Sequence, residues 1–276
     1  MTKLNFYRTA LAATVSVMAF GLAPANAADP DSCTKVRFSD VGWTDITATT
    51  ATAAVVLKAI GYEPEITVLS VPVTYQSLKN KDIDVFLGNW MPTMEADIAP
   101  YREEKSVEIF GPNLEGAKYT LATNAKGAAL GIKDFSDIGK HKDALDGKIY
   151  GIEPGNDGNR LVMTLIEKNE MGMGGLEVVE SSEQGMLAQV ARAEKAGEPV
   201  VFLGWAPHPM NSSFELTYLT GGDSTFGPNF GGATVYTNTR AGWAAQCPNA
   251  AKLVSNMKFT LPMVGGTMMA PVLKDG

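Results

Sequence analysis

Two stretches decide the fold of this sequence: YTLATN (residues 119–124) and TVYTN (residues 234–238). They are alike in residues although they lie far apart in the chain. Around them, short apolar segments alternate with longer segments of helical pattern, which is typical of a parallel sheet covered by helices. The two stretches stand where the chain would leave a first α/β lobe and come back to it. We therefore predict an α/β fold of two lobes joined by two paired hinge strands.

The alternation of segments also sets the predicted elements. We expect strands over residues 36–41, 66–71, 84–90, 148–152, 176–181 and 200–205. We expect helices over residues 47–60, 75–80, 94–102, 158–169, 183–196 and 241–257. Lobe I then comprises residues 28–116 plus 233–276, and lobe II comprises residues 117–232. A cleft between such lobes suits a small ligand, bound by residues just past the carboxyl ends of the strands.

The N-terminal segment has the order of a secretory signal peptide. Lys3 and Arg8 precede an apolar run over residues 10–23, and small residues follow it. The run is shorter than the roughly 18 apolar residues that a transmembrane anchor needs. We therefore predict that residues 1–27 are cleaved after Ala27 and that a soluble protein is exported, which in a bacterium places it in the periplasm.

Charge and cysteine content narrow the class of protein. The net charge is −7, and it would be about −9 without Lys3 and Arg8. An acidic protein of this kind is not expected to bind nucleic acid or anionic membranes. Cys33 and Cys247 are the two cysteines, and in an oxidising compartment one disulfide between them is the simple interpretation. Two separate buried thiols are the alternative, because sequence alone cannot place them within bridging distance.

Three tryptophans occur at the ends of predicted strands, each beside a glycine. Trp90 lies in FLGNWMPTM and Trp205 in FLGWAPHPM, two similar segments from different lobes, and Trp43 follows RFSDVG. Tyr119 opens the first hinge stretch. We expect these four rings to face the cleft, although large aromatics also fill protein cores. Trp243 lacks this context and is expected to pack inside its lobe.

A group of rings facing a cleft favours a quaternary ammonium ligand. Such a cation has no N–H to donate and is attracted to the negative faces of Trp and Tyr rings, with about 2 kcal/mol for each desolvated contact. Sugars stack on aromatic rings as well, and they are the competing ligand class. The rings by themselves leave both classes open.

Two polar residues would select among methylated amines. Asp45 lies close to Trp43, and a carboxylate there would accept a hydrogen bond from a hydroxyl group but repel an acid group. The alternative is that Asp45 caps the helix expected to begin near Thr47. Asn156 lies in a glycine-rich turn before a helix, where it either reaches the ligand or only holds the turn.

Residues for catalysis or metal binding are sparse. The two histidines are His141, in a polar run, and His208, between two prolines, and neither stands in a nucleophile-elbow or metal-ligand pattern. We expect His208 to lie in a surface loop. The sequence therefore predicts a binding protein without enzymatic activity, cofactor or metal. An extracytoplasmic hydrolase of choline esters or carbohydrates is the rival from another class.

Several motifs in order resemble one known family. They are DVGWTDITATTATAAVVLKAIGYE (residues 40–63), GNWMP (88–92), GIEPGNDGNR (151–160) and FLGWAPHPMN (202–211). Together they resemble the choline-binding periplasmic proteins of bacterial ABC transporters, within the glycine betaine and choline group. The likeness covers nearly all of the chain after residue 27. Members usually continue further at the C-terminus, with additional helices, which affects the expected packing of lobe I more than that of the site.

The resemblance implies a fold, a ligand and a set of residues. The fold is a two-lobed periplasmic binding protein of type II, a monomer that closes on choline and delivers it to an ABC transporter permease. Glycine betaine and acetylcholine are the alternative ligands. The ammonium group would be boxed by Trp43, Trp90, Tyr119 and Trp205, with Asp45 and Asn156 near the hydroxyl group. The family's disulfide would fall on Cys33 and Cys247.

Overall fold

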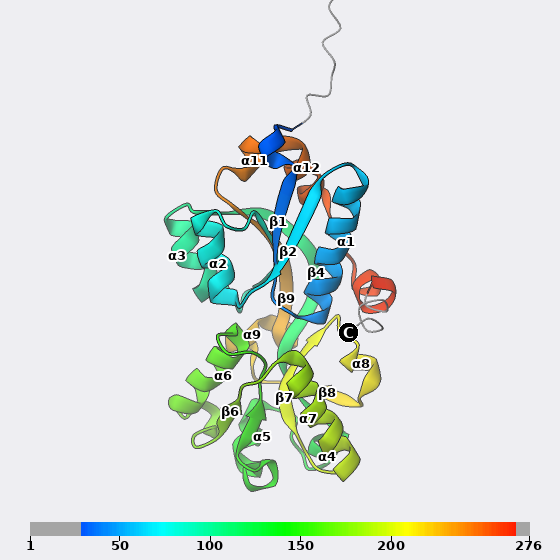
Figure 1. Cartoon of the computed structure of the whole chain (residues 1–276). Coiled ribbons are helices and arrows are strands. Elements are labelled where there is room, and N and C mark those ends of the chain that lie inside the picture. Colours follow the sequence, from blue (N-terminus) through cyan, green and yellow to red (C-terminus); the bar gives the residue numbers. More distant parts are fainter. Residues whose placement is uncertain (1–28, 269–276) are drawn as a thin grey trace, which may run out of the picture.

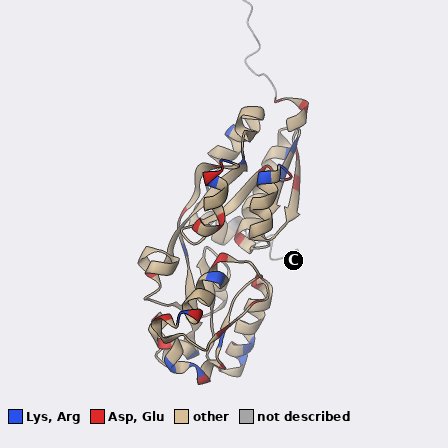
Figure 2. Cartoon of the chain, turned by 90° about the vertical axis from the view of Figure 1, so that its left-hand side faces the viewer, with Lys and Arg blue, Asp and Glu red and all other residues tan. Residues whose placement is uncertain are grey.

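The computed structural model describes residues 29–268, so the predicted signal peptide lies outside the described residues. Its elements form two lobes stacked end to end, with the long strands β4 (Val107–Asn124) and β9 (Gly232–Arg240) running between them (Figure 1). Charged residues of both signs occur on both lobes (Figure 2). The expected fold of two α/β lobes connected by two strands is confirmed.

The lobes are built from different parts of the chain. Lobe I holds β1 (Lys35–Asp40), α1 (Thr44–Ala59), β2 (Glu63–Val68), α2 (Val71–Asn80), β3 (Val85–Met91), α3 (Glu95–Glu103), α11 (Trp243–Gln246) and α12 (Pro248–Asn256). Lobe II holds α4 (Ala125–Ala129), α5 (Phe135–Ile138), β5 (Lys148–Tyr150), α6 (Asp157–Glu167), β6 (Glu177–Val179), α7 (Glu183–Ala196), β7 (Val201–Ala206), α8 (Met210–Ser213), β8 (Leu216–Tyr218), α9 (Asp223–Phe226) and α10 (Pro228–Gly231).

One curled sheet continues through both lobes in the order β2-β1-β3-β9-β4-β7-β5-β6, with β8 paired to β4. The pairs that involve neither β4 nor β9 are parallel: β1 with β2 and β3, and β5 with β6 and β7. The pairs that involve β4 or β9 are antiparallel. The predicted parallel sheet is therefore correct for the other strands and wrong for β4 and β9, because β4 leaves lobe I and β9 returns to it.

The register of the hinge corrects one expectation. β4 and β9 pair from Val107 opposite Arg240 to Lys118 opposite Gly232, so the pairing ends just before Tyr119. Residues 118–123 pair with β7 of lobe II, so Lys118 has a partner on each side. The stretches YTLATN and TVYTN thus belong to paired strands but are not partners of one another. β4 is long enough to pair with β9 along one part and with lobe II along the next.

The C-terminal end of lobe I shows a second difference. The helix expected over residues 241–257 is broken into α11 and α12 at Pro248, which lacks the N–H that a continuous helix needs but fits the first turn of a new one. Cys247 at this break forms the disulfide with Cys33, with a Cα–Cα distance of 5.6 Å. Trp243 stacks on Phe110 at 6.2 Å, so its predicted packing role is confirmed. Within residues 29–268, none of the helices combines the length and apolar character needed to cross a membrane.

Candidate functional site

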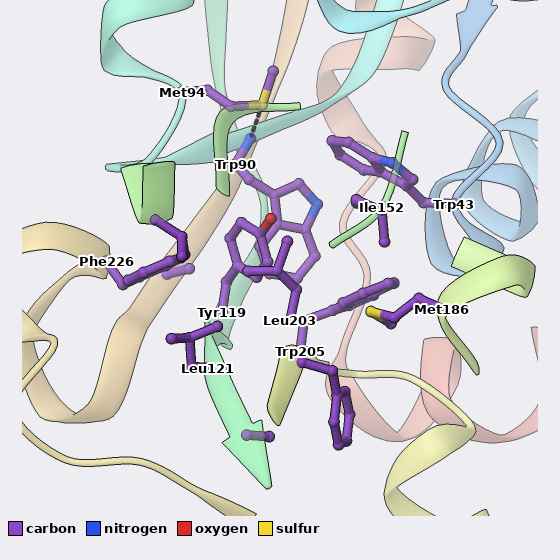
Figure 3. Packing of buried hydrophobic residues seen from close by; sticks show 14 of the residues in the cluster. Trp43, Trp90, Met94, Tyr119, Leu121, Ile152, Met186, Leu203, Trp205 and Phe226 are labelled. Atoms are coloured by element: carbon purple, nitrogen blue, oxygen red, sulfur yellow. Dashed lines mark hydrogen bonds between the residues drawn. The ribbon is translucent and has the colours of Figure 1, made fainter. Parts of the chain in front are cut away.

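Four aromatic rings meet where the lobes face each other. Trp43 precedes α1, Trp90 ends β3, Tyr119 lies in β4, and Trp205 lies near the end of β7. All four are at most 5% exposed. Together with two residues of lobe II, Ile152 and Asn156, they line a narrow cavity. Figure 3 shows the four rings and Ile152. The structure therefore brings together the rings that the sequence placed in the cleft.

Tyr119 lies at the centre of the ring cluster. Its ring centroid is 6.0 Å from that of Trp90 and 6.2 Å from that of Trp205, with interplanar angles of 65° and 90°. Tyr119 and Trp205 are also direct partners in the β4–β7 ladder, which holds their side chains on one face of the sheet. In an edge-to-face pair each ring keeps at least one face that its partner does not cover, and a cation within about 6 Å of a ring centroid is attracted to such a face.

A glycine allows the helix that carries Asn156 to approach Tyr119. At Gly158, in the first turn of α6, an added Cβ would lie 2.0 Å from the Tyr119 hydroxyl oxygen. That hydroxyl donates to Asn156 Oδ1 at 2.9 Å. Any side chain at position 158 would therefore push Tyr119 out of its place in the ring cluster.

Asn156 holds the turn before α6 and also lies at the wall of the cavity. It is the N-cap of α6, where its Oδ1 accepts the backbone N–H of Asn159 at 3.1 Å. The same residue lines the cavity and is fully buried. Its Nδ2 donates to Asp157 Oδ1 at 3.2 Å. The turn geometry thus fixes the amide at the wall of the cavity.

Asp45 lies behind the cavity wall and is not one of the lining residues. The alternative, that Asp45 caps the helix, is wrong: Trp43 occupies the N-cap position of α1, and Asp45 lies in the first turn. Asp45 Oδ1 accepts the indole N–H of Trp205 at 3.2 Å, and Oδ2 has no partner among the described residues. Burial, and then the negative charge of Glu183, raise the pKa of Asp45 to about 8.

The indole N–H groups of the other two tryptophans differ in their partners. Trp43 Nε1 donates to Glu153 Oε1 at 2.9 Å, whereas Trp90 Nε1 is buried without a partner among the described residues. Glu153 and Asp157 are acidic residues of the site that our sequence analysis missed. Burial is the main reason why the pKa of Glu153 is raised to about 7 and that of Asp157 to about 6. Their position in GIEPGNDGNR beside Asn156 was the signal that could have found them.

The sequence suggested that His208 lies in a surface loop, and this prediction is wrong. Its side chain is 2% exposed, and its ring packs against Trp205 with centroids 4.7 Å apart. Nδ1 accepts the backbone N–H of Met210 at 3.0 Å, and Nε2 lies 3.1 Å from Glu183 Oε1. Glu183 begins α7, and a helix start alone gave no sequence signal that it lies behind the site. Among the described residues, no group of three or more His, Cys, Asp or Glu side chains is arranged to hold a metal ion.

Comparison with known proteins also points to a substrate-binding protein of an ABC transporter. Residues 34–275 match the family described as the substrate binding domain of ABC-type glycine betaine transport systems. The structure of an ABC-transporter choline binding protein in complex with choline is 71% identical, with a TM-score of 0.88 over 90% of this chain and 86% of that chain. Lactococcal OpuAC, closed and complexed with glycine betaine, is 26% identical, with a TM-score of 0.74 over 88% of this chain and 90% of that chain.

A curated relative extends the comparison to sequence. An uncharacterized protein of Chromohalobacter salexigens, named ORF1, is 52% identical over 129 residues, which are 47% of this chain and 83% of the relative. The matched family consists of extracytoplasmic solute-binding proteins that serve membrane transporters, and they are not enzymes. This chain belongs to the OpuAC family, the substrate-binding domains of ABC-type glycine betaine transport systems.

Proposed function

We propose that this protein captures choline outside the cytoplasm and delivers it to the permease of an ABC transporter. The observation that carries the proposal is the cavity between the lobes, lined by Trp43, Trp90, Tyr119 and Trp205. The choline complex of a protein 71% identical in sequence supports the same ligand. The rings can attract a permanently charged, methylated nitrogen that offers no N–H group to hydrogen bond.

The free energy that four rings contribute is comparable to that of micromolar binding. Each desolvated contact between a cation and a ring contributes about 2 kcal/mol, so four rings supply on the order of 8 kcal/mol. Ordering of the ligand and of the lobes offsets part of this gain. Micromolar affinity corresponds to about 8 kcal/mol. Hydrogen bonds from polar groups at the wall would supply the remainder.

The charges around the cavity favour a hydroxyl over an acid group. Neither Lys nor Arg occurs among the described residues that line the cavity. Asp45 and Asp157 are buried near it, and Glu153 is half-buried beside Trp43. Where these acids are ionised, above their raised pKa values, a carboxylate on the ligand would meet negative charge without a compensating cation, which disfavours glycine betaine.

We assign the site, the lobes and the location as follows. The box consists of Trp43, Trp90, Tyr119 and Trp205, and the ligand's hydroxyl group lies toward Asp45 and Asn156. Lobe I comprises residues 28–116 plus 233–276, and lobe II residues 117–232. The pairing of β4 with β9 up to Lys118, and with β7 from Lys118 onward, supports this boundary. Residues 1–27 are a cleaved signal peptide, and the mature monomer works in the periplasm.

Calorimetric titration with choline, acetylcholine and glycine betaine tests the proposal. We expect choline to bind with micromolar or tighter affinity and to exceed glycine betaine by at least tenfold. Acetylcholine carries the same ammonium group and is expected to bind in the same box with an affinity set by its larger acyl end. Tighter binding of glycine betaine than of choline would overturn the assignment.

A further inference from the structure

Three consecutive residues at the start of α1 each bond to a different element of lobe II. The Trp43 indole donates to Glu153, in the loop after β5. Asp45 accepts from the indole of Trp205, on β7. Between them, Thr44 donates its backbone N–H to Glu183 Oε2 at 2.8 Å and its hydroxyl to Glu183 Oε1. Trp43 lines the ligand cavity, but neither Thr44 nor Glu183 does so.

The carboxylate of Glu183 lies at a junction of two helices. Glu183 is the first residue of α7, and its side chain points at the first turn of α1. The N-terminal end of a helix favours negative charge. The side chain is 2% exposed. A buried carboxylate is costly unless donors surround it, and here two donors come from the opposite lobe. Glu183 is therefore compensated in the closed arrangement by groups that separation of the lobes would remove.

Within lobe II, His208 holds the same carboxylate from the other side. Because His208 Nδ1 accepts the N–H of Met210, the ring proton of the neutral histidine is on Nε2, which lies 3.1 Å from Glu183 Oε1. This contact is within ion-pair distance although it is not aligned for a hydrogen bond. The contact with His208 orients the Glu183 side chain toward α1 and does not involve Thr44. His208 also packs on the ring of Trp205, so the junction is continuous with the box.

We infer that Glu183 is a positioning residue that latches α1 to lobe II when the lobes close over the ligand. The inference rests on the proposed function, because a latch raises affinity only where closure accompanies binding. A ligand shifts the lobes toward the closed form by its preference for that form, and a weaker latch lowers the fraction of protein that is competent to hold it. Acting through closure, Glu183 thus raises the affinity for choline and acetylcholine by the same factor.

Calorimetry on latch variants tests this role. Glu183→Gln keeps the size of the side chain but replaces one acceptor with a donor, so we expect choline and acetylcholine to lose affinity by the same factor, at least about tenfold, as for a charge-assisted hydrogen bond. Thr44→Val should give a similar loss, and Thr44→Ser should restore wild-type affinity because it restores the hydroxyl donor. The double variant Thr44→Val/Glu183→Gln should bind no more weakly than the weaker single variant.

X-ray scattering in solution supplies the readout that a general loss of structure would not reproduce. Choline should make the wild type more compact, and Glu183→Gln should reach the same compact form only at higher choline concentration. Wild-type affinity and compaction in Glu183→Gln, or fully additive losses in the double variant, would overturn the latch. Failure of the wild type to bind choline would instead count against the proposed function, so the two results are distinguishable.

A matched control separates the latch from ordinary ion pairs between the lobes. Arg160 on α6 forms a bidentate pair with Asp97 on α3, with distances of 2.7 and 2.9 Å. The Arg160 side chain is 41% exposed, and such pairs contribute little in water. Arg160→Met should therefore reduce choline affinity by less than about threefold. A loss as large as that of Glu183→Gln would show that any contact between the lobes has the same effect, which contradicts a specific latch.

Discussion

The loops that carry Trp90 and Trp205 are similar in sequence, one in each lobe, yet their indoles are used differently. Both tryptophans end a strand and are followed by a cis X-Pro bond, Met91–Pro92 and Ala206–Pro207. The lobe I loop has one more residue, Asn89, and the β3–β9 ladder shifts register between Phe86 and Asn89 to accommodate it. The lobe II indole donates to Asp45 across the gap, whereas the N–H of Trp90 is unpartnered among the described residues.

This difference indicates that the two tryptophans have different roles in the box. Trp205 contributes a ring face and also ties lobe II to α1 through Asp45. Trp90 contributes a ring face, and its free N–H is available to a ligand or a water molecule. Local sequence similarity therefore specifies where the rings lie but not how each is connected.

The largest expected effect comes from removing the ring that has two roles. Trp205→Ala deletes a cation–π face worth about 2 kcal/mol and leaves both carboxylate oxygens of Asp45 without a partner. Choline affinity should fall by about a hundredfold or more, measured by calorimetry. Trp90→Ala deletes a ring face alone and should cost about thirtyfold. Equal losses of affinity in Trp205→Ala and Trp90→Ala would contradict the different roles of the two indoles. Trp243 lies in the separate core of lobe I, so the control Trp243→Phe should leave choline affinity unchanged.

A second effect should come from crowding Tyr119. Gly158→Ala places a methyl group where the Tyr119 hydroxyl now lies, so the central ring must move. We expect choline affinity to fall by about thirtyfold, since one ring face is worth about 2 kcal/mol. Gly61→Ala is a useful control, because an added Cβ there meets nothing within 4 Å, although its φ of +97° costs some stability. Unchanged binding in Gly158→Ala would show that Tyr119 does not contribute a ring to the box.

Substitution of Asp45 should alter the choice of ligand. Asp45→Asn keeps an acceptor for the Trp205 N–H but removes the negative charge that Asp45 carries above its raised pKa of about 8. At about pH 9, choline should therefore bind about tenfold more weakly while glycine betaine improves. Titration of both ligands against wild type and variant gives the ratio directly. If neither affinity changes, Asp45 does not act on the ligand.

The pH dependence of binding should be moderate. The pKa of Asp45 is raised to about 8 and that of Glu153 to about 7, so these acids are largely protonated in the ligand-free protein at low pH. A permanent cation favours their ionised forms. Choline affinity should therefore rise as pH increases from about 6 to 8, with the upper part of the rise lost in Asp45→Asn. Affinity that falls over this range would contradict the assignment of these acids to the site.

The smallest effect on binding should come from the disulfide. Cys33 and Cys247 both lie in lobe I, away from the cavity, and their bond closes a loop of 214 residues. Removing it by Cys33→Ser/Cys247→Ser should lower the free energy of unfolding by roughly 2 to 5 kcal/mol. Choline affinity at 25 °C should stay within about twofold, as measured on protein that thermal unfolding shows to be folded. A large loss of affinity would mean that the ends of lobe I control the site.

The sequence predicted the lobes and the ring cluster well because both depend on local patterns. Strand periodicity, glycine beside tryptophan, and a repeated loop all lie within short segments. The register of β4 and the burial of His208 and Glu183 depend on contacts between distant segments, which no local pattern encodes. Asn156 combines a role that a local pattern predicts with one that it does not: it caps α6, and it also forms part of the cavity wall.

The central claim is that ring faces from two lobes hold a permanent positive charge. Calorimetric titration with choline and with its neutral analogue, in which carbon replaces the nitrogen, tests it most directly because the two ligands share shape and hydroxyl group. We predict that choline binds at least a hundredfold more tightly than the analogue. Equal affinity for the two would contradict the account, because the rings would then be acting as a hydrophobic pocket without regard to charge.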